Sequence, residues 1–207
     1  MLFLAGDIGG TKALLQLSYR PPEQATDLST STNRSNTDNT DNTKYKPLQL
    51  AKQSYPCDNF DSLESIINTF LSQALSADNL STFSIVDTDV NFAADLVSIQ
   101  SACFGLPGPV NGSSVQLTNL PWVVDAQKIE QACSIQSVHF VNDFYAAARG
   151  VQSLDEDDVI ALYSPPEQIT ATGNRLVIGA GTGLGVAPLF YDGKNYLPVT
   201  SEGGYLM

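Results

Sequence analysis

The chain has 207 residues and a formal net charge of −12, because it contains 22 acidic residues and only 10 basic ones. Its length supports one large core or two modest ones, and its hydrophobic content of 43% is ordinary for a globular protein. An acidic chain repels the phosphates of nucleic acid and of anionic lipid, so we expect neither as a partner. Any phosphate ligand should then be held by backbone N–H groups and a metal ion rather than by a basic cluster.

The cysteines and the N-terminus indicate a cytoplasmic chain. Its three cysteines are scattered, and no pair has the close spacing of a zinc knuckle or a redox motif. The apolar start, Met1–Ala5, lacks a basic region and runs directly into Gly6, which is more typical of a buried strand than of a signal peptide. No stretch approaches the roughly 20 apolar residues of a membrane span. We therefore expect reduced thiols, a cytoplasmic location and no membrane partner.

Two strands joined by a glycine-rich bend open the chain. Residues 2–5 and 13–17 have the composition of strands, and Gly6–Gly10 are expected to turn between them. The segment Ser29–Thr43 that follows is almost entirely Ser, Thr, Asn and Asp. Such a segment cannot bury enough apolar surface to offset the entropy lost on ordering. It predicts a disordered surface insertion near residues 21–46.

The remainder of the chain alternates between helices and strands. The clearest helix is 61–75, whose apolar residues share one face and whose Asp61 and Glu64 resemble a capping box. The further predicted elements are a strand at 96–104, a helix at 125–133, a strand at 138–141, a helix at 144–151 and a strand at 175–178. This alternation predicts an α/β fold. We expect two domains, 1–152 and an incomplete 153–207, with the active site between them.

The first chemical motif is the segment Gly6–Thr11. Its adjacent glycines remove Cβ atoms where the backbone must approach another group closely, and exposed N–H groups in such a turn can bind phosphate oxygens. Asp7 leaves the strand in the direction that suits a water-mediated Mg²⁺ contact. The alternative is an ordinary hairpin turn. An aspartate directly after a buried strand, and Thr11 directly after the glycines, favour the phosphate site.

The second motif is Asn142-Asp143, where a buried strand becomes a helix. Ligands of open α/β sheets bind at the carboxyl ends of strands. Asp143 could therefore accept a hydroxyl proton, and Asn142 could hydrogen-bond a neighbouring hydroxyl. Equally, Asp143 could simply cap the helix that follows. The residues alone leave both interpretations open.

The third motif is Gly179–Gly185, in which glycines alternate after a strand. It lacks the G-x-G-x-x-G spacing of the dinucleotide fingerprint and the Gly-Lys-Ser/Thr of a Walker loop. Alternating glycines suit a strand-turn-strand hairpin whose backbone lies against a phosphate. A flexible glycine loop is the alternative, which the strict alternation disfavours.

Together these motifs, in this order, resemble the bacterial glucokinases, members of the superfamily of actin-like proteins, sugar kinases and heat-shock ATPases. The matching segments are GDIGGTKALLQL, LTNLPW, FVNDF, GAGTGLGVA and SEGG. The resemblance implies ribonuclease H-like (actin-like ATPase) domains. It also implies ATP-dependent transfer of phosphate to the 6-hydroxyl of glucose, with ATP and Mg²⁺ as cofactors.

The same resemblance implies a role for individual residues. Asp143 becomes the base that deprotonates the sugar, Asn142 and Glu202 hydrogen-bond sugar hydroxyls, and Asn119 belongs to the sugar loop. Tyr205 occupies the place of a sugar-contacting histidine of the family. The residues implied to hold the nucleotide phosphates, with Asp7 reaching Mg²⁺ through water, are Gly6, Asp7, Ile8, Gly9, Gly10, Thr11, Gly181, Thr182 and Gly183.

Two aromatic or titratable side chains near these motifs are expected to pack rather than to react. They are His139, in the strand before Asn142, and Trp122, in the sugar loop. Because the family continues beyond Met207, we expect this chain to have little turnover by itself.

Three alternatives to a glucokinase stay open. The tyrosine at position 205 favours a kinase of another hexose, such as mannose or an N-acetylated amino sugar. A non-catalytic sugar or nucleotide sensor and an inactive gene product are the others. A homodimer is a further expectation.

Overall fold

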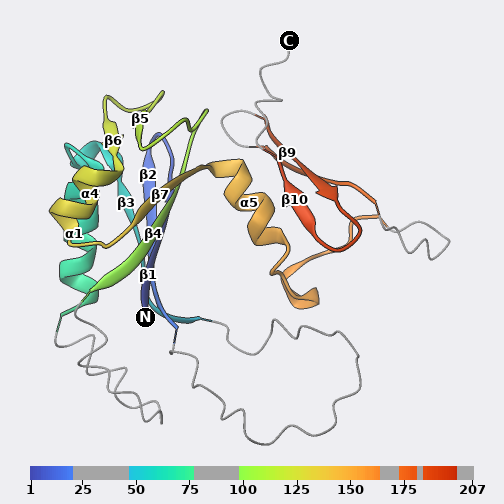
Figure 1. Ribbon diagram of the computed structural model, residues 1–207, viewed down its shortest axis with the longest axis horizontal. Coiled ribbons are helices and arrows are strands. Elements are labelled where there is room, and N and C mark those ends of the chain that lie inside the picture. The colour runs from blue at the N-terminus through green and yellow to red at the C-terminus, as the bar shows by residue number, and fades with distance from the viewer. Residues whose placement is uncertain (21–46, 77–97, 164–172, 181–183, 200–207) are drawn as a thin grey trace, which may run out of the picture.

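The computed structural model describes residues 1–20, 47–76, 98–163, 173–180 and 184–199, and it has the predicted α/β architecture (Figure 1). The predicted insertion near residues 21–46 lies outside the described residues. In the described part of the chain, none of the helices has the length and apolar character needed to span a membrane.

A five-stranded sheet forms the centre of the N-terminal region, in the order β3-β2-β1-β4-β7. Its strands are β1 (Leu2–Ile8), β2 (Lys12–Tyr19), β3 (Leu48–Pro56), β4 (Ile99–Leu106) and β7 (Val138–Asn142). The strands β1, β4 and β7 are parallel, whereas β2 is antiparallel to both of its neighbours. The carboxyl ends of the three parallel strands therefore meet at one edge of the sheet.

The bend between β1 and β2 is shorter than the sequence predicts. We expected Gly6–Gly10 to turn, but β1 continues to Ile8 and only residues 9–11 lie between the strands. Gly6 lies within the sheet, where an added Cβ would come within 2.5 Å of Phe104 Cδ1 and 2.9 Å of Leu15 Cδ2. The missing side chain at Gly6 therefore serves core packing.

Helices α1 (Leu63–Ala74) and α4 (Ala126–Cys133) cover one face of this sheet (Figure 1). The predicted apolar face of α1 is confirmed, since its buried residues are Leu63, Ile66, Ile67, Phe70, Leu71 and Ala74. The predicted Asp61 cap is wrong. Ser62 caps the helix instead, because its hydroxyl accepts the Ser65 N–H at 3.2 Å.

A two-stranded sheet of β5 (Ser114–Gln116) and β6 (Val123–Asp125) stands at the edge where the parallel strands end (Figure 1). Trp122, just before β6, is 7% exposed and joins the main core, which confirms its packing role. The packing predicted for His139 is wrong: its side chain is exposed on the edge strand β7 and hydrogen-bonds Ser137 Oγ at 2.9 Å.

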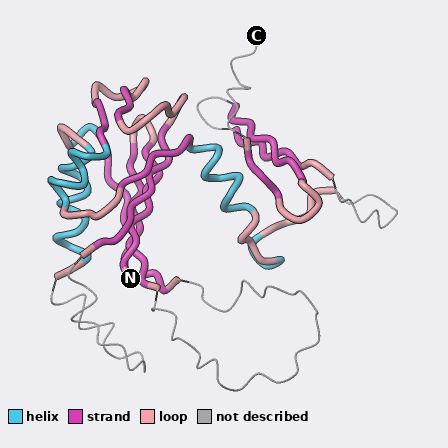
Figure 2. Tube along the Cα trace, in the orientation of Figure 1, coloured by secondary structure: helices cyan, strands magenta, loops and turns pink. Residues whose placement is uncertain are grey.

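Helix α5 (Asp143–Val151) covers part of the other face and joins the first sheet to a second one (Figure 2). The second sheet is antiparallel and consists of β8 (Arg175–Ala180), β9 (Leu184–Tyr191) and β10 (Tyr196–Pro198). Ala148 of α5 packs there against Ala187 and Leu189. Two short 3₁₀ helices, Cys57–Asn59 and Glu156–Asp158, complete the described elements. The predicted division after residue 152 stays a prediction.

Candidate active site

Two aspartates lie at the edge where the parallel strands end. The pairing places Asp7 of β1 level with Gly105 of β4, and Gly105 level with Val141 of β7. Asp143 follows two residues later as the first residue of α5. A Cβ at Gly105 would lie 3.4 Å from the Asp143 Cα, so a glycine between the two strands lets α5 begin close to the sheet. Sequence reasoning missed this role of Gly105.

The carboxylates of Asp7 and Asp143 interact electrostatically. The pKa of Asp7 is raised above its ordinary value, first by burial against neighbouring protein atoms and second by the negative charge of Asp143. Two carboxylates that repel one another at a partly exposed strand end form a site that a cation would stabilise. Oxygen ligands of this kind are those that Mg²⁺ prefers.

Asn142 is the residue that fixes Asp143 in place. Its Oδ1 accepts the Tyr145 N–H at 3.0 Å and so caps α5, and its Nδ2 donates to the Gly108 carbonyl at 3.1 Å. The side chain is only 6% exposed. The alternative that Asp143 caps the helix is therefore wrong. Asp143 Oδ1 instead accepts the N–H of the adjacent Phe144 at 2.8 Å.

The first glycine turn, residues 9–11, is held from two sides. Cys57 donates its N–H to the Thr11 carbonyl at 2.9 Å and its thiol to the Gly9 carbonyl at 3.7 Å. Burial and the nearby Asp58 raise the pKa of that thiol, so it keeps its proton for this contact. No local spacing could have identified Cys57, because 48 positions separate it from Gly9.

The sugar loop predicted around Asn119 lies against the same turn. A Cβ added at Gly10 would come within 2.7 Å of the Asn119 Cβ, so the two segments are in direct contact. The turn can therefore present backbone groups beside a second polar loop. Ile8, by contrast, is fully buried, so only its backbone could reach a ligand.

The second glycine motif contributes to β8 and β9, which pair antiparallel as the predicted hairpin requires, and residues 181–183 between them lie outside the described residues. Gly179 pairs with Gly185 across β8 and β9, and both face the ring of Phe144. A Cβ at Gly179 would come within 2.7 Å of Phe144 Cζ, and one at Gly185 would overlap the same ring. These two glycines thus let the hairpin dock on α5. The predicted site residues Gly181, Thr182, Gly183, Glu202 and Tyr205 lie outside the described residues.

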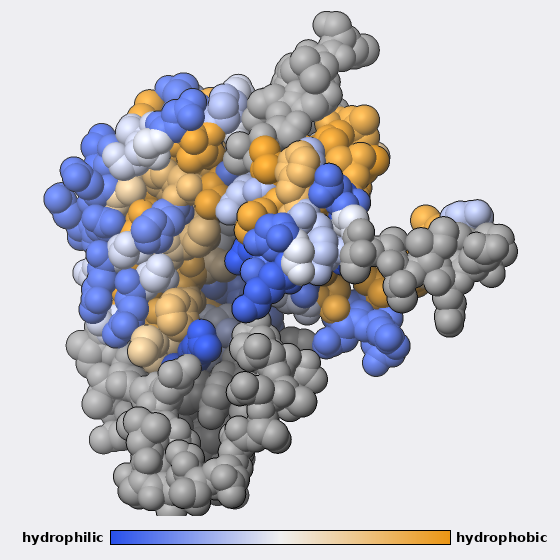
Figure 3. Space-filling model, turned by 45° about the vertical axis from the view of Figure 1, so that its right-hand side comes forward, coloured by the Kyte–Doolittle hydropathy of each residue, from blue (hydrophilic) through white to orange (hydrophobic). Residues whose placement is uncertain are grey.

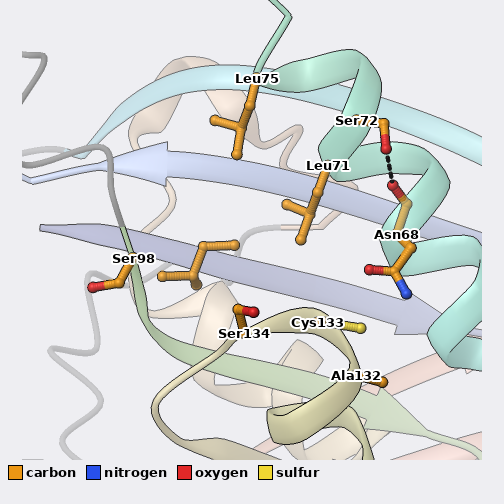
Figure 4. A pocket seen from close by; sticks show the side chains of 9 residues that line it. Asn68, Leu71, Ser72, Leu75, Ser98, Ala132, Cys133 and Ser134 are labelled. Carbon is orange, nitrogen blue, oxygen red and sulfur yellow. Dashed lines mark hydrogen bonds between the residues drawn. The ribbon is translucent and has the colours of Figure 1, made fainter.

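A pocket of about 360 Å³ lies elsewhere, between α1 and α4 (Figure 4). It borders Ile99 at the start of β4, whereas Asp7 and Asp143 lie at the opposite ends of the strands. The Ser72 hydroxyl donates to the Asn68 carbonyl at 2.7 Å there. Burial and Glu64 raise the pKa of the Cys133 thiol to about 11, so it is protonated at neutral pH. None of the residues that line this pocket carries a charged side chain that could bind a phosphate.

Comparisons with known proteins agree with this geometry. A crystal structure of glucokinase from an Antarctic psychrotroph matches at a TM-score of 0.62 and 25% identity, covering 99% of this chain and 51% of that one. One of glucokinase from Balamuthia mandrillaris in complex with glucose matches at a TM-score of 0.54 and 20% identity, covering 97% of this chain and 47% of that one. This likeness supports a sugar-kinase fold of the actin-like ATPase type.

The sequence comparisons place the chain more narrowly. The sequence model of the family described as Glucokinase matches residues 4–207, so the chain belongs to the glucokinase family. The glucokinase of Nostoc punctiforme is 32% identical over 205 residues, which cover 99% of this chain and 47% of that protein. The chain thus spans about half the length of the curated relatives it matches.

Proposed function

We propose that the site belongs to an ATP-dependent glucokinase, which transfers phosphate to the 6-hydroxyl of glucose. The observation that carries the proposal is the juxtaposition of Asp7 and Asp143 at the ends of parallel strands, beside the glycine turn at residues 9–11. Membership of the glucokinase family supports the same reaction. Glucose as the substrate is also supported by the Balamuthia mandrillaris glucokinase, which was crystallised in complex with glucose.

The described residues have different roles in the proposed reaction. Asp143 accepts the proton of the attacking hydroxyl, a role commonly worth about 10² to 10⁴ in rate. Asn142 keeps that carboxylate at the helix start through its contacts with Tyr145 and Gly108. The backbone of residues 9–11 binds phosphate oxygens of ATP, and Asn119 stands beside them to contact the sugar.

Asp7 is the residue that would hold Mg²⁺, through a bound water. Its raised pKa reflects unfavourable negative charge, which a cation would offset. When bound, Mg²⁺ neutralises charge on the transferring phosphate. The phosphate contacts of Gly181, Thr182 and Gly183, and the sugar contacts of Glu202 and Tyr205, belong to the proposal as well. A cytoplasmic location and a homodimer complete it.

A chimera tests this function. The part of Nostoc punctiforme glucokinase that this chain does not match is fused after Met207, and ADP release is measured with glucose and Mg-ATP. We expect turnover from the chimera, and a kcat lower by about 10² to 10⁴ for Asp143→Asn, with a much smaller change in KM for glucose. A chimera that turns over with near-unchanged kcat after Asp143→Asn would remove this residue from the reaction.

A second candidate reaction is phosphorylation of another hexose, favoured by the tyrosine at position 205. The same chimera, assayed with glucose, mannose and N-acetylated amino sugars, separates the two. If the chimera has its highest kcat/KM with a sugar other than glucose, the result supports this alternative. A chimera that binds sugar and nucleotide without turnover would indicate a sensor.

A further inference from the structure

The sugar loop, which spans residues 117–122 and carries Asn119, joins β5 to β6 and is anchored at both of its ends. Its first residue, Leu117, is 3% exposed and its last residue, Trp122, is 7% exposed, so both side chains lie in the main core. The Leu117 N–H also donates to the Trp122 carbonyl at 3.0 Å. Residues 118–121, between these two anchors, are exposed or only partly buried.

Gln116, the last residue of β5, binds both ends of this loop with one side-chain amide. Its Nε2 donates to the Leu117 carbonyl at 3.3 Å and to the Trp122 carbonyl at 3.1 Å. The Trp122 carbonyl therefore accepts both from the Gln116 side chain and from the Leu117 backbone. A carbonyl oxygen has two lone pairs, so it can accept from both donors. The side chain of Gln116 thus closes the loop where it leaves the strands.

An exposed glutamine is ordinarily a solvated surface residue. Gln116 is exposed, and Figure 3 shows hydrophilic and apolar side chains intermixed over the side of the molecule that carries the five-stranded sheet. A glutamine held in one rotamer loses side-chain entropy, so its ordering needs a specific contact. Two hydrogen bonds from the same amide to the two ends of one loop are such a contact. They distinguish Gln116 from a residue that only faces water.

The closed loop lies between two parts of the candidate site. On one side Asn119 lies against the glycine turn, since a Cβ added at Gly10 would come within 2.7 Å of the Asn119 Cβ. On the other side, the Thr118 methyl group would lie 3.8 Å from a Cβ added at Gly108. The Gly108 carbonyl in turn accepts the side-chain amide of Asn142, which caps α5. The shape of the loop therefore determines where Asn119 stands relative to the turn and to α5.

We propose that Gln116 is a positioning residue for the sugar, because it closes the sugar loop and so holds Asn119 beside the glycine turn. The inference rests on the proposed function and concerns the same site. Gln116 acts through the loop and needs no contact with sugar or nucleotide. The glycine turn has its own support from Cys57, so loss of the Gln116 contacts loosens the loop and leaves the turn in place. Binding of the sugar then weakens, whereas binding of ATP does not.

Hydrogen exchange of the 207-residue chain tests the closure of the loop without any ligand. Gln116→Met keeps an unbranched side chain of similar length but removes the donor. We expect the Leu117 amide to exchange about fivefold faster in Gln116→Met than in wild type, because the loop opens more often. The matched control is Gln53→Met, the same substitution at an exposed glutamine of the edge strand β3. It should leave the exchange of Leu117 unchanged.

Kinetics of the chimera with Nostoc punctiforme glucokinase test the effect on the sugar. Gln116→Met should raise KM for glucose about fivefold, while kcat and KM for ATP change by less than about twofold. Gln116→Glu should raise KM for glucose at least as much, because its carboxylate would face two carbonyl oxygens without a donor. Gln116→Lys returns a donor and should recover most of the loss. Gln53→Met should leave all three constants unchanged.

Three results would overturn the proposal. Unchanged exchange of Leu117 in Gln116→Met would show that this side chain does not close the loop. Faster exchange with an unchanged KM for glucose would show that closure does not place Asn119 for the sugar. A comparable loss in kcat or in KM for ATP would indicate a general disturbance of the fold rather than positioning of the sugar.

Failure of the proposed function gives a different result. A wild-type chimera that turns over no sugar contradicts that function, whatever the exchange of Leu117. Calorimetric titration of the chimera with glucose then decides the role of Gln116, and we expect the Kd to rise about fivefold in Gln116→Met. An equal Kd in the two proteins, or no binding of glucose by the wild-type chimera, would overturn the role of Gln116 as well.

Discussion

In the five-stranded region and in the three-stranded region alike, side chains alternate between the two faces of the sheet. The two regions differ greatly in how many of their apolar side chains are buried. The main core contains buried residues between Leu2 and Val138 and is covered on one side by α1 and α4. Among the described residues, the small core has three buried members, Ala148, Ala187 and Leu189. A sheet becomes stable when its apolar side chains find a second layer, so strand formation by itself does not make a core.

The largest expected effect comes from comparing one substitution in each core. Phe70 is 1% exposed and packs edge-on against Tyr55 at 6.4 Å between ring centres. Phe70→Ala should lower the free energy of unfolding by about 3–5 kcal/mol. Leu189→Ala in the small core should cost about 2 kcal/mol, because its surroundings can relax. Urea unfolding measures both, and an equal or larger cost for Leu189→Ala would contradict the comparison.

The next effect concerns how the small sheet docks on α5. Gly185→Ala places a methyl group into the Phe144 ring, so the hairpin must move away at a cost of about 1–3 kcal/mol. Gly173→Ala is the control, since nothing lies within 4 Å of its added Cβ. Hydrogen exchange of the β8 and β9 amides should become faster only in Gly185→Ala. Unchanged exchange would mean that Phe144 adapts without loss.

A smaller effect is expected at the helix that bears Asp143. Asn142→Ala removes the α5 cap and the bond to the Gly108 carbonyl, which should cost about 1–2 kcal/mol of stability. Asn142→Asp retains a cap acceptor but loses the donor, so its loss should be smaller. Chemical denaturation ranks the three proteins. If Asn142→Ala is as stable as wild type, these two hydrogen bonds do not hold the helix start.

The smallest effect is a pH dependence at Asp7. Its pKa in the folded protein is raised, so the folded state holds a proton more readily than the unfolded state does. Stability therefore falls as the pH rises from the ordinary aspartate value through the raised one, and the penalty persists at neutral pH. Asp7→Asn removes it. The variant should melt at a higher temperature than wild type near neutral pH.

The same variant provides its own control in acid. Below the ordinary pKa of aspartate, wild-type Asp7 is protonated in both states, and the difference between the two melting temperatures should disappear. A difference that stays constant across the pH range would show that it arises from something other than ionisation of Asp7. A variant less stable than wild type at neutral pH would reverse the assigned sign.

Local patterns in the sequence predicted several of the elements but not β5, β6 or β10, and the family was predicted from a resemblance. The apolar stripe of 61–75 predicted α1, and the alternating glycines of 179–185 predicted the hairpin of β8 and β9. The ordered motifs predicted a glucokinase, and the family match confirms that membership. The helix and the two strands were predictable because each depends on residues that are neighbours along the chain.

Only the tertiary structure decided what lies beside these elements. It placed Gly6 within the sheet against Phe104, exposed His139 on an edge strand, and gave the helix cap to Asn142 rather than Asp143. It also brought Cys57 to the glycine turn. Each of these outcomes depends on the strand order, on the register and on the position of α5, which bring residues far apart in the sequence into contact. Local spacing can specify a strand or a turn, but which face of it is covered depends on the partner that packs there.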